Sequence, residues 1–316
     1  MNCQGASPLT MSSLPPGIIC NSRIQLVPVA HPRSIGELTE LLDEESHTVL
    51  LAGGTDFMVG LNHGSTRLAP DDLIVDLRSV AELSTVEVDY QQQVLRLGAG
   101  VRWDDLLTAP IAEIAPCLSQ AARTVGSHQI RTAGTIGGNL ATASPAGDGV
   151  CALVALDATL VLTSSRGQRT VAVSEFAIAP KKNVLERDEF IERVDIPITD
   201  GWQGYSKIGT RNAMVISVAG VAVVLSSESN TCRIALGSVG PTVILSKEAS
   251  EFAGTAINWT RASISSADLE TVVEMTRASA TPIDDHRSTA AYRKHAVGVL
   301  TKRLIEQGLT TLRTSL

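Results

Sequence analysis

Two glycine pairs are the residues whose type and spacing suggest chemistry in this chain. The first lies in the segment Leu50-Leu51-Ala52-Gly53-Gly54-Thr55-Asp56-Phe57, and the second lies in Thr135-Ile136-Gly137-Gly138-Asn139. Paired glycines after an apolar strand let backbone N–H groups turn toward one point with no side chain in the way. Such a concavity suits an anion, most often a phosphate. Two such turns predict contacts with the two ends of a pyrophosphate, although each pair is equally compatible with a plain tight turn.

The common motifs for nucleotides, metals and nucleophiles are missing. Gly98-Ala99-Gly100 lacks the third glycine of the dinucleotide fingerprint, and the sequence contains no Gly-Lys-Ser/Thr loop, H-E-x-x-H or G-x-S-x-G. The five cysteines have no C-x-x-C spacing, so neither a disulfide framework nor a cysteine-ligated metal is predicted. His128, beside the second pair, is more typical of a surface or loop histidine than of a base. We therefore expect no catalytic side chain and no metal site on this chain.

Composition excludes several classes of function. The 316 residues include 26 Lys+Arg against 33 Asp+Glu, with only 4 Phe, 3 Trp and 3 Tyr, so a nucleic-acid binder is not expected. Hydrophobic residues make up 44% of the chain, which is enough for folded cores. The longest apolar runs, such as 218–225, fall far short of the ~20 residues that span a bilayer. The N-terminus has neither the basic nor the apolar region of a secretory signal, so a reduced, cytoplasmic protein is expected.

Local patterns predict the elements that position the two glycine pairs. Ile35, Leu38, Leu41 and Leu42 have helical spacing, with Ser34 and Glu37 as a capping box, so a helix is expected over 34–44. Pro110 and Pro116 should split the helical segment 103–125. The predicted strands are 48–52, 72–77, a hairpin over 86–100, a second hairpin over 155–176 with its turn at 165–167, 215–225 and 232–238. The predicted later helices are 267–278 and 288–306.

Changes in composition and the breaks between predicted elements suggest a tail followed by three units. The tail covers residues 1–23 and is expected to be flexible, with Met11 as an alternative start. The expected units are 24–83, 84–201 and 202–316.

Three ordered motifs together resemble a known family. They are LLAGGTD, HQIRTAGTIGGNLATASPAGD and KIGTRNAM, followed by a closing segment DDHRSTAAYRKHAVGVLTKRLI. Their order and spacing are similar to the FAD-binding (medium) subunit of the molybdenum hydroxylases, which include xanthine dehydrogenase and carbon monoxide dehydrogenase. The resemblance runs from about Ile24 to the C-terminal segment. It implies an α+β, vanillyl-alcohol oxidase-like fold in which two subdomains, 24–83 and 84–201, clasp FAD beside a C-terminal α/β domain, 202–316.

The resemblance also implies which residues contact FAD. The first glycine pair and its neighbours, Leu50 to Phe57, would lie along the pyrophosphate through backbone amides, with Asp56 contributing chiefly through its backbone. The second pair matches the other phosphate-contacting loop, with the Thr135 hydroxyl as a donor. The remaining positions that match flavin contacts are Val125, Asp148, Ile191 and Lys207.

Several of these residues have other possible roles. Asp148 is also a favoured residue for capping a helix from Gly149 onward. Lys207 and Arg211 are compatible with solvated charges beside a strand. Arg131 has two open interpretations, as a counter-charge to phosphate or as a member of a structural ion pair.

The function implied by the resemblance is electron transfer in an oxidoreductase complex. Relatives oxidise their organic substrate at a molybdopterin cofactor on a large subunit and pass electrons through two [2Fe-2S] clusters on a small subunit to FAD, then to NAD+ or another acceptor. The resemblance is greatest to the xanthine dehydrogenase FAD subunit, and the implied assembly is a dimer of heterotrimers. Carbon monoxide dehydrogenase, aldehyde or N-heterocycle types remain open, as do a stand-alone flavin oxidoreductase and an assembly subunit that has lost FAD.

Overall fold

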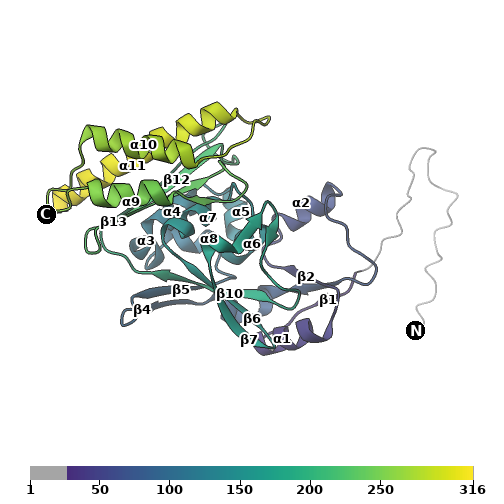
Figure 1. Cartoon of the computed structure of the whole chain (residues 1–316). Helices are drawn as coiled ribbons and strands as arrows, with labels where there is room; N and C mark the ends of the chain where they lie inside the picture. The colour runs from purple at the N-terminus through teal and green to yellow at the C-terminus, as the bar shows by residue number, and fades with distance from the viewer. Residues whose placement is uncertain (1–26, 316) are drawn as a thin grey trace, which may run out of the picture.

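The protein combines helices and antiparallel and parallel strands, as the predicted α+β class requires. The fold is described from a computed structural model, which places residues 27–315 (Figure 1). The predicted tail, residues 1–23, and the alternative start at Met11 lie outside the described residues. Among the described residues, no helix is both long enough and apolar enough to span a membrane.

The first sheet is a small parallel one that ends at the first glycine pair. Its order is β1 (Val29–Ala30), β3 (Leu73–Asp76), β2 (Thr48–Leu51). Helix α1 (Ile35–Glu44) buries Leu38 and Leu42, as its apolar spacing predicts. Helix α2 (Phe57–Asn62) follows β2, and the short 3-10 turns Leu77–Ser79 and Ala81–Ser84 follow β3.

The start of α1 confirms one half of the predicted capping box. The Ser34 hydroxyl accepts the Glu37 N–H at 3.1 Å, which satisfies one of the unpaired amides of the first turn. The Glu37 carboxylate accepts the Arg33 N–H at 2.7 Å rather than the Ser34 N–H, so the reciprocal bond is displaced by one residue.

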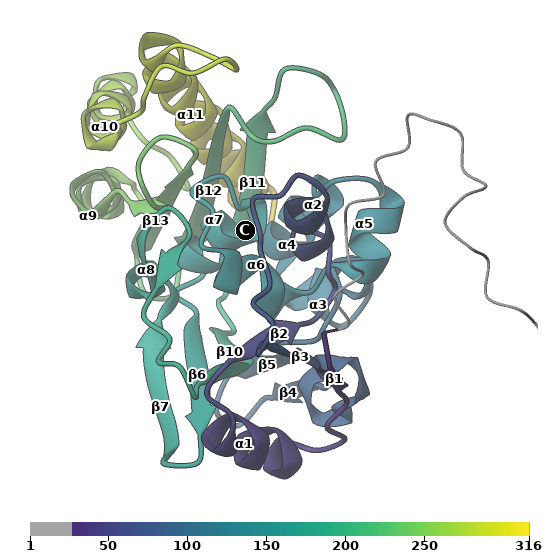
Figure 2. The same ribbon diagram turned by 90° about the vertical axis from the view of Figure 1, so that its right-hand side faces the viewer.

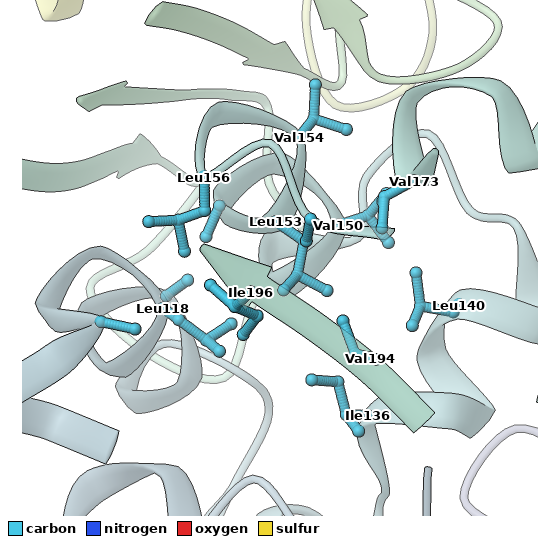
Figure 3. Close-up of a cluster of buried hydrophobic side chains, with 14 of the residues drawn as sticks. Leu118, Ile136, Leu140, Val150, Leu153, Val154, Leu156, Val173, Val194 and Ile196 are labelled. Carbon is cyan, nitrogen blue, oxygen red and sulfur yellow. The ribbon is translucent and has the colours of Figure 1, made fainter. Parts of the chain in front are cut away.

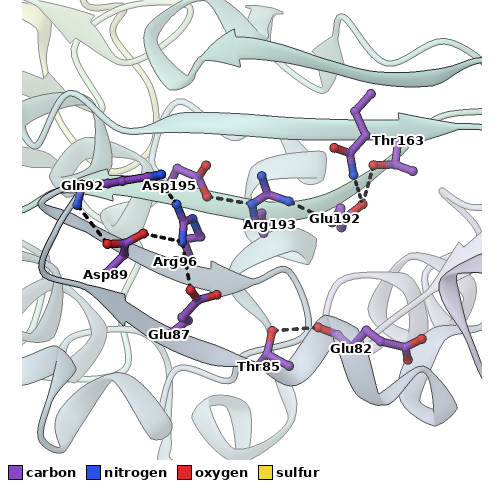
Figure 4. Close-up of polar contacts among 11 residues, drawn as sticks. Glu82, Thr85, Glu87, Asp89, Gln92, Arg96, Thr163, Glu192, Arg193 and Asp195 are labelled. Carbon is purple, nitrogen blue, oxygen red and sulfur yellow. Dashed lines mark hydrogen bonds and ion pairs between the residues drawn. The ribbon is translucent and has the colours of Figure 1, made fainter.

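The second sheet has five antiparallel strands and two different faces. Its order is β4 (Val86–Asp89), β5 (Val94–Gly98), β10 (Phe190–Pro197), β6 (Thr159–Ser164), β7 (Gly167–Ala172), which confirms both predicted hairpins. On one face Arg96 pairs with Glu87 and Asp89, and Glu192 accepts a hydrogen bond from Thr163 at 2.6 Å (Figure 4). The other face is apolar and belongs to the main core.

Short helices connect these strands and reach the second glycine pair. They are α3 (Ile111–Ile114), α4 (Pro116–Arg123), α5 (His128–Ala133), α6 (Ile136–Thr142), α7 (Asp148–Ala155) and α8 (Val173–Phe176), preceded by a 3-10 turn at Asp105–Leu107. Pro110 precedes α3 and Pro116 is the first residue of α4, so the prolines split this segment as predicted. A small hairpin of β8 (Ala177–Ala179) and β9 (Lys182–Asn183) leads to β10.

The third sheet is antiparallel and lies between two layers of helices. Its order is β11 (Trp202–Ile208), β12 (Ala219–Ser226), β13 (Thr231–Gly237), β14 (Ile244–Leu245). Helices α9 (Lys247–Ala256), α10 (Ser266–Ser279) and α11 (Ala290–Ser315) cover one side, and α4 and α7 pack on the other (Figures 1 and 2). Both predicted later helices are confirmed, and the second is longer than predicted.

The prediction that a strand starts at Val215 is wrong, although the later part of that strand is present. Strand β12 begins at Ala219, and residues 209–218 form a loop that rejoins the sheet through a bond from the Val218 N–H to the Ile208 carbonyl at 2.7 Å. Val215 and Ile216 leave the ladder and line a cavity instead.

Helix α7 joins the second and third sheets into one core. All eight of its residues are buried, and its apolar side chains pack against Val194 and Ile196 of β10 and Leu118 of α4 (Figure 3). The same cluster includes Ala222 and Val224 of β12. The division into units 24–83, 84–201 and 202–316 therefore stays a prediction from the sequence. The hydrophobic core continues across the predicted boundary between residues 201 and 202.

Candidate cofactor-binding site

A cavity of about 970 Å³ lies where the two glycine pairs meet. This is the size of a ligand or cofactor pocket. It is lined by fifteen of the residues expected to contact FAD, namely Leu50, Leu51, Ala52, Gly53, Gly54, Thr55, Asp56, Phe57, Val125, Thr135, Gly137, Gly138, Asn139, Asp148 and Ile191. Ile136 and Lys207 are not in the lining; the Ile136 side chain is fully buried in the core.

The first glycine loop, residues 50–57, presents backbone amides that the protein does not use. Strand β2 ends at Leu51, and Gly54 then adopts a left-handed φ of 69°, which glycine tolerates without a steric penalty. The N–H groups of Gly53, Gly54 and Thr55 donate to no acceptor among the described residues. Unpaired amides on a cavity wall are suitable donors for an anionic ligand.

The second glycine segment, residues 135–139, is the beginning of a helix and not the predicted turn. Thr135 is the N-cap of α6, and its hydroxyl oxygen accepts the Gly138 N–H at 3.0 Å. The Thr135 hydroxyl donates to no acceptor among the described residues, so its O–H remains available toward the cavity.

Four of the five backbone amides of this second segment, those of residues 136–139, are already occupied. Ile136 and Gly137 donate to the carbonyls of Val101 and Ala99 at 2.9 and 2.8 Å, and Asn139 donates to the Thr135 carbonyl. The second segment therefore offers side-chain groups to a ligand rather than a row of amides. They are the Thr135 hydroxyl and the Asn139 side chain, whose buried Oδ1 has no described partner.

The two glycine regions touch each other directly. A Cβ built on Gly53 would lie 2.1 Å from the Ala133 carbonyl oxygen, so only glycine allows this approach. The Thr142 hydroxyl, which donates to the Gly138 carbonyl at 2.8 Å, also lies 3.3 Å from the Asp56 carboxylate. These contacts hold α2 next to α6, and the two helices lie side by side in Figures 1 and 2.

Asp148 is a buried carboxylate on the cavity wall. Gly147 is the N-cap of α7, so the predicted alternative in which Asp148 caps this helix is wrong. Its Oδ1 accepts the Tyr205 hydroxyl at 2.7 Å, and its Oδ2 accepts the Lys207 ammonium at 2.5 Å. The Thr124 hydroxyl, which donates to the Ala121 carbonyl at 2.8 Å, lies 3.3 Å from Oδ2. Burial raises the pKa of Asp148, and the adjacent charge and hydrogen bonds of Lys207 oppose that rise.

Lys207 lies behind Asp148. Its ammonium donates to the carbonyls of Thr124 at 3.0 Å and Val215 at 3.2 Å as well as to Asp148. An ammonium has three N–H donors, so all of them have protein acceptors. The solvated-charge alternative does not hold for Lys207, whose side chain is only 10% exposed.

Other basic residues near the site have structural partners. The Arg131 guanidinium donates to the carbonyls of Val125 and Gly126, and this side chain is absent from the cavity lining. His128 is exposed, 3.6 Å from Asp104, and also absent from the lining. Arg211 donates to the carbonyls of Ala213 and Met214 in its own loop.

Sequence reasoning missed several lining residues. Ala99 and Gly100 of the incomplete glycine fingerprint line the same cavity, followed by Arg102 and Trp103. The exposed side chains of Arg102 and Lys181 have no ion-pair partner among the described residues. The sequence signal available for Arg102 and Trp103 was their place directly after the Gly98-Ala99-Gly100 strand end.

These donors fit FAD. A dinucleotide has an anionic diphosphate at its centre and apolar or polar rings at its ends. The unpaired amides of Gly53, Gly54 and Thr55 and the charges of Arg102 and Lys181 suit the diphosphate. The apolar wall of Leu50, Val125 and Ile191 suits a ring.

Comparisons with known proteins agree with this geometry. A sequence model described as the FAD binding domain in molybdopterin dehydrogenase matches residues 22–199, and one described as the CO dehydrogenase flavoprotein C-terminal domain matches residues 205–307. The chain is 30% identical over 297 residues to the nicotine 6-hydroxylase medium subunit of Paenarthrobacter nicotinovorans, covering 92% of this chain and 100% of that one. It is 29% identical over 283 residues to the putative xanthine dehydrogenase FAD-binding subunit of Escherichia coli K12, covering 87% and 94%.

A solved structure shows the same fold. Carbon monoxide dehydrogenase from Hydrogenophaga pseudoflava contains a chain that superposes with a TM-score of 0.79 at 26% identity, covering 90% of this chain and 97% of that chain. The predicted α+β FAD-binding fold is thereby confirmed.

Proposed function

The chain belongs to the family of FAD-binding subunits of the molybdenum hydroxylases, and from this premise we propose that it takes electrons from [2Fe-2S] clusters of a partner subunit and passes them to NAD+ or another acceptor. Family membership makes it an FAD-dependent oxidoreductase subunit. When bound, FAD supplies the chemistry by which single electrons are collected and released as a pair.

The protein's own groups bind and orient the cofactor in this proposal. The amides of Gly53, Gly54 and Thr55 donate to the diphosphate, and the Thr135 hydroxyl adds a donor from the second glycine segment. The bare Cα of Gly138 leaves room beside them. We assign no proton-transfer role to any side chain, because delivery of electrons from a flavin depends on position and access.

The partners belong to the same proposal. We propose an iron-sulfur small subunit and a molybdopterin large subunit, in a cytoplasmic dimer of heterotrimers. The names of the relatives point to N-heterocyclic substrates, nicotine and xanthine, and to carbon monoxide, all at similar identity. A xanthine-type enzyme remains our first proposal for the complex, with a carbon monoxide, N-heterocycle or aldehyde type as the alternatives.

The observation that carries the proposal is the row of unused amides in the first glycine loop, in the same cavity that Asp148 lines. The test is an absorbance spectrum of the purified full chain, alone and in the complex that co-purifies with it, followed by acid release of the chromophore. Bands near ~370 and ~450 nm with releasable FAD are expected for a bound flavin. A colourless chain and complex that take up no FAD would support an assembly subunit. A flavin that stays bound after acid would support a self-sufficient oxidase.

A further inference from the structure

The cavity wall contains a buried charge pair whose two members have different access to a ligand. Asp148 lines the cavity, whereas Lys207 lies outside the lining, 2.5 Å from the Asp148 carboxylate. The side chains are 8% and 10% exposed, so both charges are largely removed from water. Removing one member of such a pair would leave the other charge buried without a counter-charge.

Lys207 has no donor left for a ligand. Its three N–H groups are directed to Asp148 and to the carbonyls of Thr124 and Val215. These acceptors belong to the start of α7, the end of α4 and the loop after β11, so the ammonium ties three elements together behind the wall. A ligand in the cavity would have to break one of these bonds to reach Lys207.

Asp148 does have capacity for one more hydrogen bond. Its Oδ2 accepts from Lys207 and lies 3.3 Å from the Thr124 hydroxyl, which donates to the Ala121 carbonyl at 2.8 Å. Its Oδ1 accepts from Tyr205 alone. Each carboxylate oxygen has two lone pairs, so Oδ1 can accept one further N–H or O–H. FAD carries such donors in its ribityl hydroxyls and its ring N–H.

We propose that Lys207 is a positioning residue that acts on FAD only through Asp148, whose carboxylate it orients as an acceptor for one N–H or O–H of the cofactor. This inference rests on the proposed function, because it requires FAD in the cavity. It differs from a direct contact between Lys207 and FAD, the role that the sequence resemblance implies.

A double-mutant cycle on the FAD dissociation constant tests this inference. The variants are Asp148→Asn, Lys207→Met and the double variant, made in the full chain and measured by equilibrium dialysis against FAD, in the co-purified complex if the chain alone does not hold the cofactor. Asp148→Asn and Lys207→Met are each expected to raise the Kd about tenfold, the usual effect of losing a charge-assisted hydrogen bond. In the Asp148→Asn background, Lys207→Met is expected to change the Kd by less than about twofold, because the residue through which it acts is already altered.

The opposing outcomes are distinct. A further tenfold loss in the double variant relative to Asp148→Asn would mean that Lys207 contacts FAD itself. A lower melting temperature with an unchanged Kd for Lys207→Met would mean a purely structural role. If Lys207→Met alone fails to fold, the comparison of Asp148→Asn with the double variant, in which both charges are gone, still decides between the two contacts.

A matched control removes a lysine elsewhere. Lys302 on α11 pairs with Glu270 and is absent from the cavity lining, so Lys302→Met should leave the Kd unchanged. Wild-type chain and complex that both fail to bind FAD would refute the proposed function itself, which separates that failure from a failure of this inference.

Discussion

Replacement of Gly138 by leucine separates binding of the cofactor from stability of the fold. Gly138 lines the cavity, and a Cβ built on it would meet only the Thr135 Oγ1, at 3.1 Å. The leucine side chain therefore extends into the cavity and not into the protein. The space that it takes is the space that we assign to FAD.

The size of each effect follows from this geometry. Gly138 is the third residue of the seven-residue helix α6. The gain from leucine is therefore at most the about 0.8–1 kcal/mol that applies in a helix interior, and the close contact with Thr135 offsets it. The melting temperature of the FAD-free protein should stay within about 3 °C of wild type. Overpacking costs about 1–3 kcal/mol where neighbours adjust, so FAD should bind about 5- to 150-fold more weakly.

The assay is equilibrium dialysis against FAD together with thermal unfolding of the FAD-free protein. Gly36→Leu is the matched control, because Gly36 is an exposed helical glycine whose added Cβ would meet only the Ser34 Oγ, at 3.7 Å. It should bind FAD as wild type does. A folded Gly138→Leu variant with wild-type affinity would refute the assignment of this part of the cavity to FAD. Loss of the fold would refute our account of the space around Gly138.

Three further predictions concern other parts of the chain. Gly53→Ala should lower both FAD affinity and stability, the latter by about 1–3 kcal/mol in denaturant unfolding, because its Cβ would meet the Ala133 carbonyl at 2.1 Å. For Asp285, burial alone would raise the pKa, but hydrogen bonds from the Arg287 amide and the buried Arg293 guanidinium outweigh it and lower that pKa to about 2. Because the folded-state pKa of Asp285 is lowered from 3.8, its ionised carboxylate stabilises the fold above about pH 4, and this stabilisation disappears as the pH falls toward 2. Asp285→Asn should therefore have a lower melting temperature than wild type at pH 7. The difference in melting temperature should disappear between about pH 4 and pH 2. Burial raises the pKa of the Cys117, Cys151 and Cys232 thiols, to about 12 for Cys232. These thiols should therefore resist labelling at pH 8 until the chain unfolds, which peptide mapping of the labelled protein would measure.

Local signals predicted the elements that local physics determines. Helix α1 follows from the spacing of Leu38 and Leu42 and from the Ser34 cap. The breaks at Pro110 and Pro116 follow from the missing N–H of proline. Both hairpins of the second sheet follow from alternation around short polar turns.

Elements held by distant partners were not predictable in this way. Helix α6 contains two glycines and is seven residues long, so its sequence favours a turn; the carbonyls of Ala99 and Val101 fix its first amides from far along the chain. The apolar residues Val215 and Ile216 suggested a strand, but they line the cavity instead of pairing in the sheet. In both segments the residue types predict burial, but they do not predict which part of the protein covers the segment.

The motifs pointed to one region of the fold but did not give its geometry. Fifteen of the seventeen residues expected to contact FAD line one cavity, and many other residues that line it carry no motif. The motifs did not reveal that Lys207 lies behind Asp148, because that pair is separated by 59 positions in the chain and by a sheet boundary. They also missed Trp103, which packs so closely that a Cβ on Gly149 would meet its ring at 2.1 Å.

The glycine pairs themselves show why a motif alone could not assign the roles. In each pair one glycine is required by the protein's own packing: Gly53 lies against Ala133, and a Cβ on Gly137 would meet Ala99 at 2.6 Å. The other glycine of each pair lines the cavity: Gly54 has a left-handed backbone, and a Cβ on Gly138 would meet only the Thr135 Oγ1, at 3.1 Å. A bulky residue at Gly53 or Gly137 disturbs the fold whether or not a cofactor binds, so its effect on FAD is ambiguous. At Gly138 an added Cβ meets a single protein group, the Thr135 Oγ1 at 3.1 Å, and the rest of the side chain takes the space that we assign to FAD, so Gly138 is the position where an effect on FAD is least mixed with an effect on the fold.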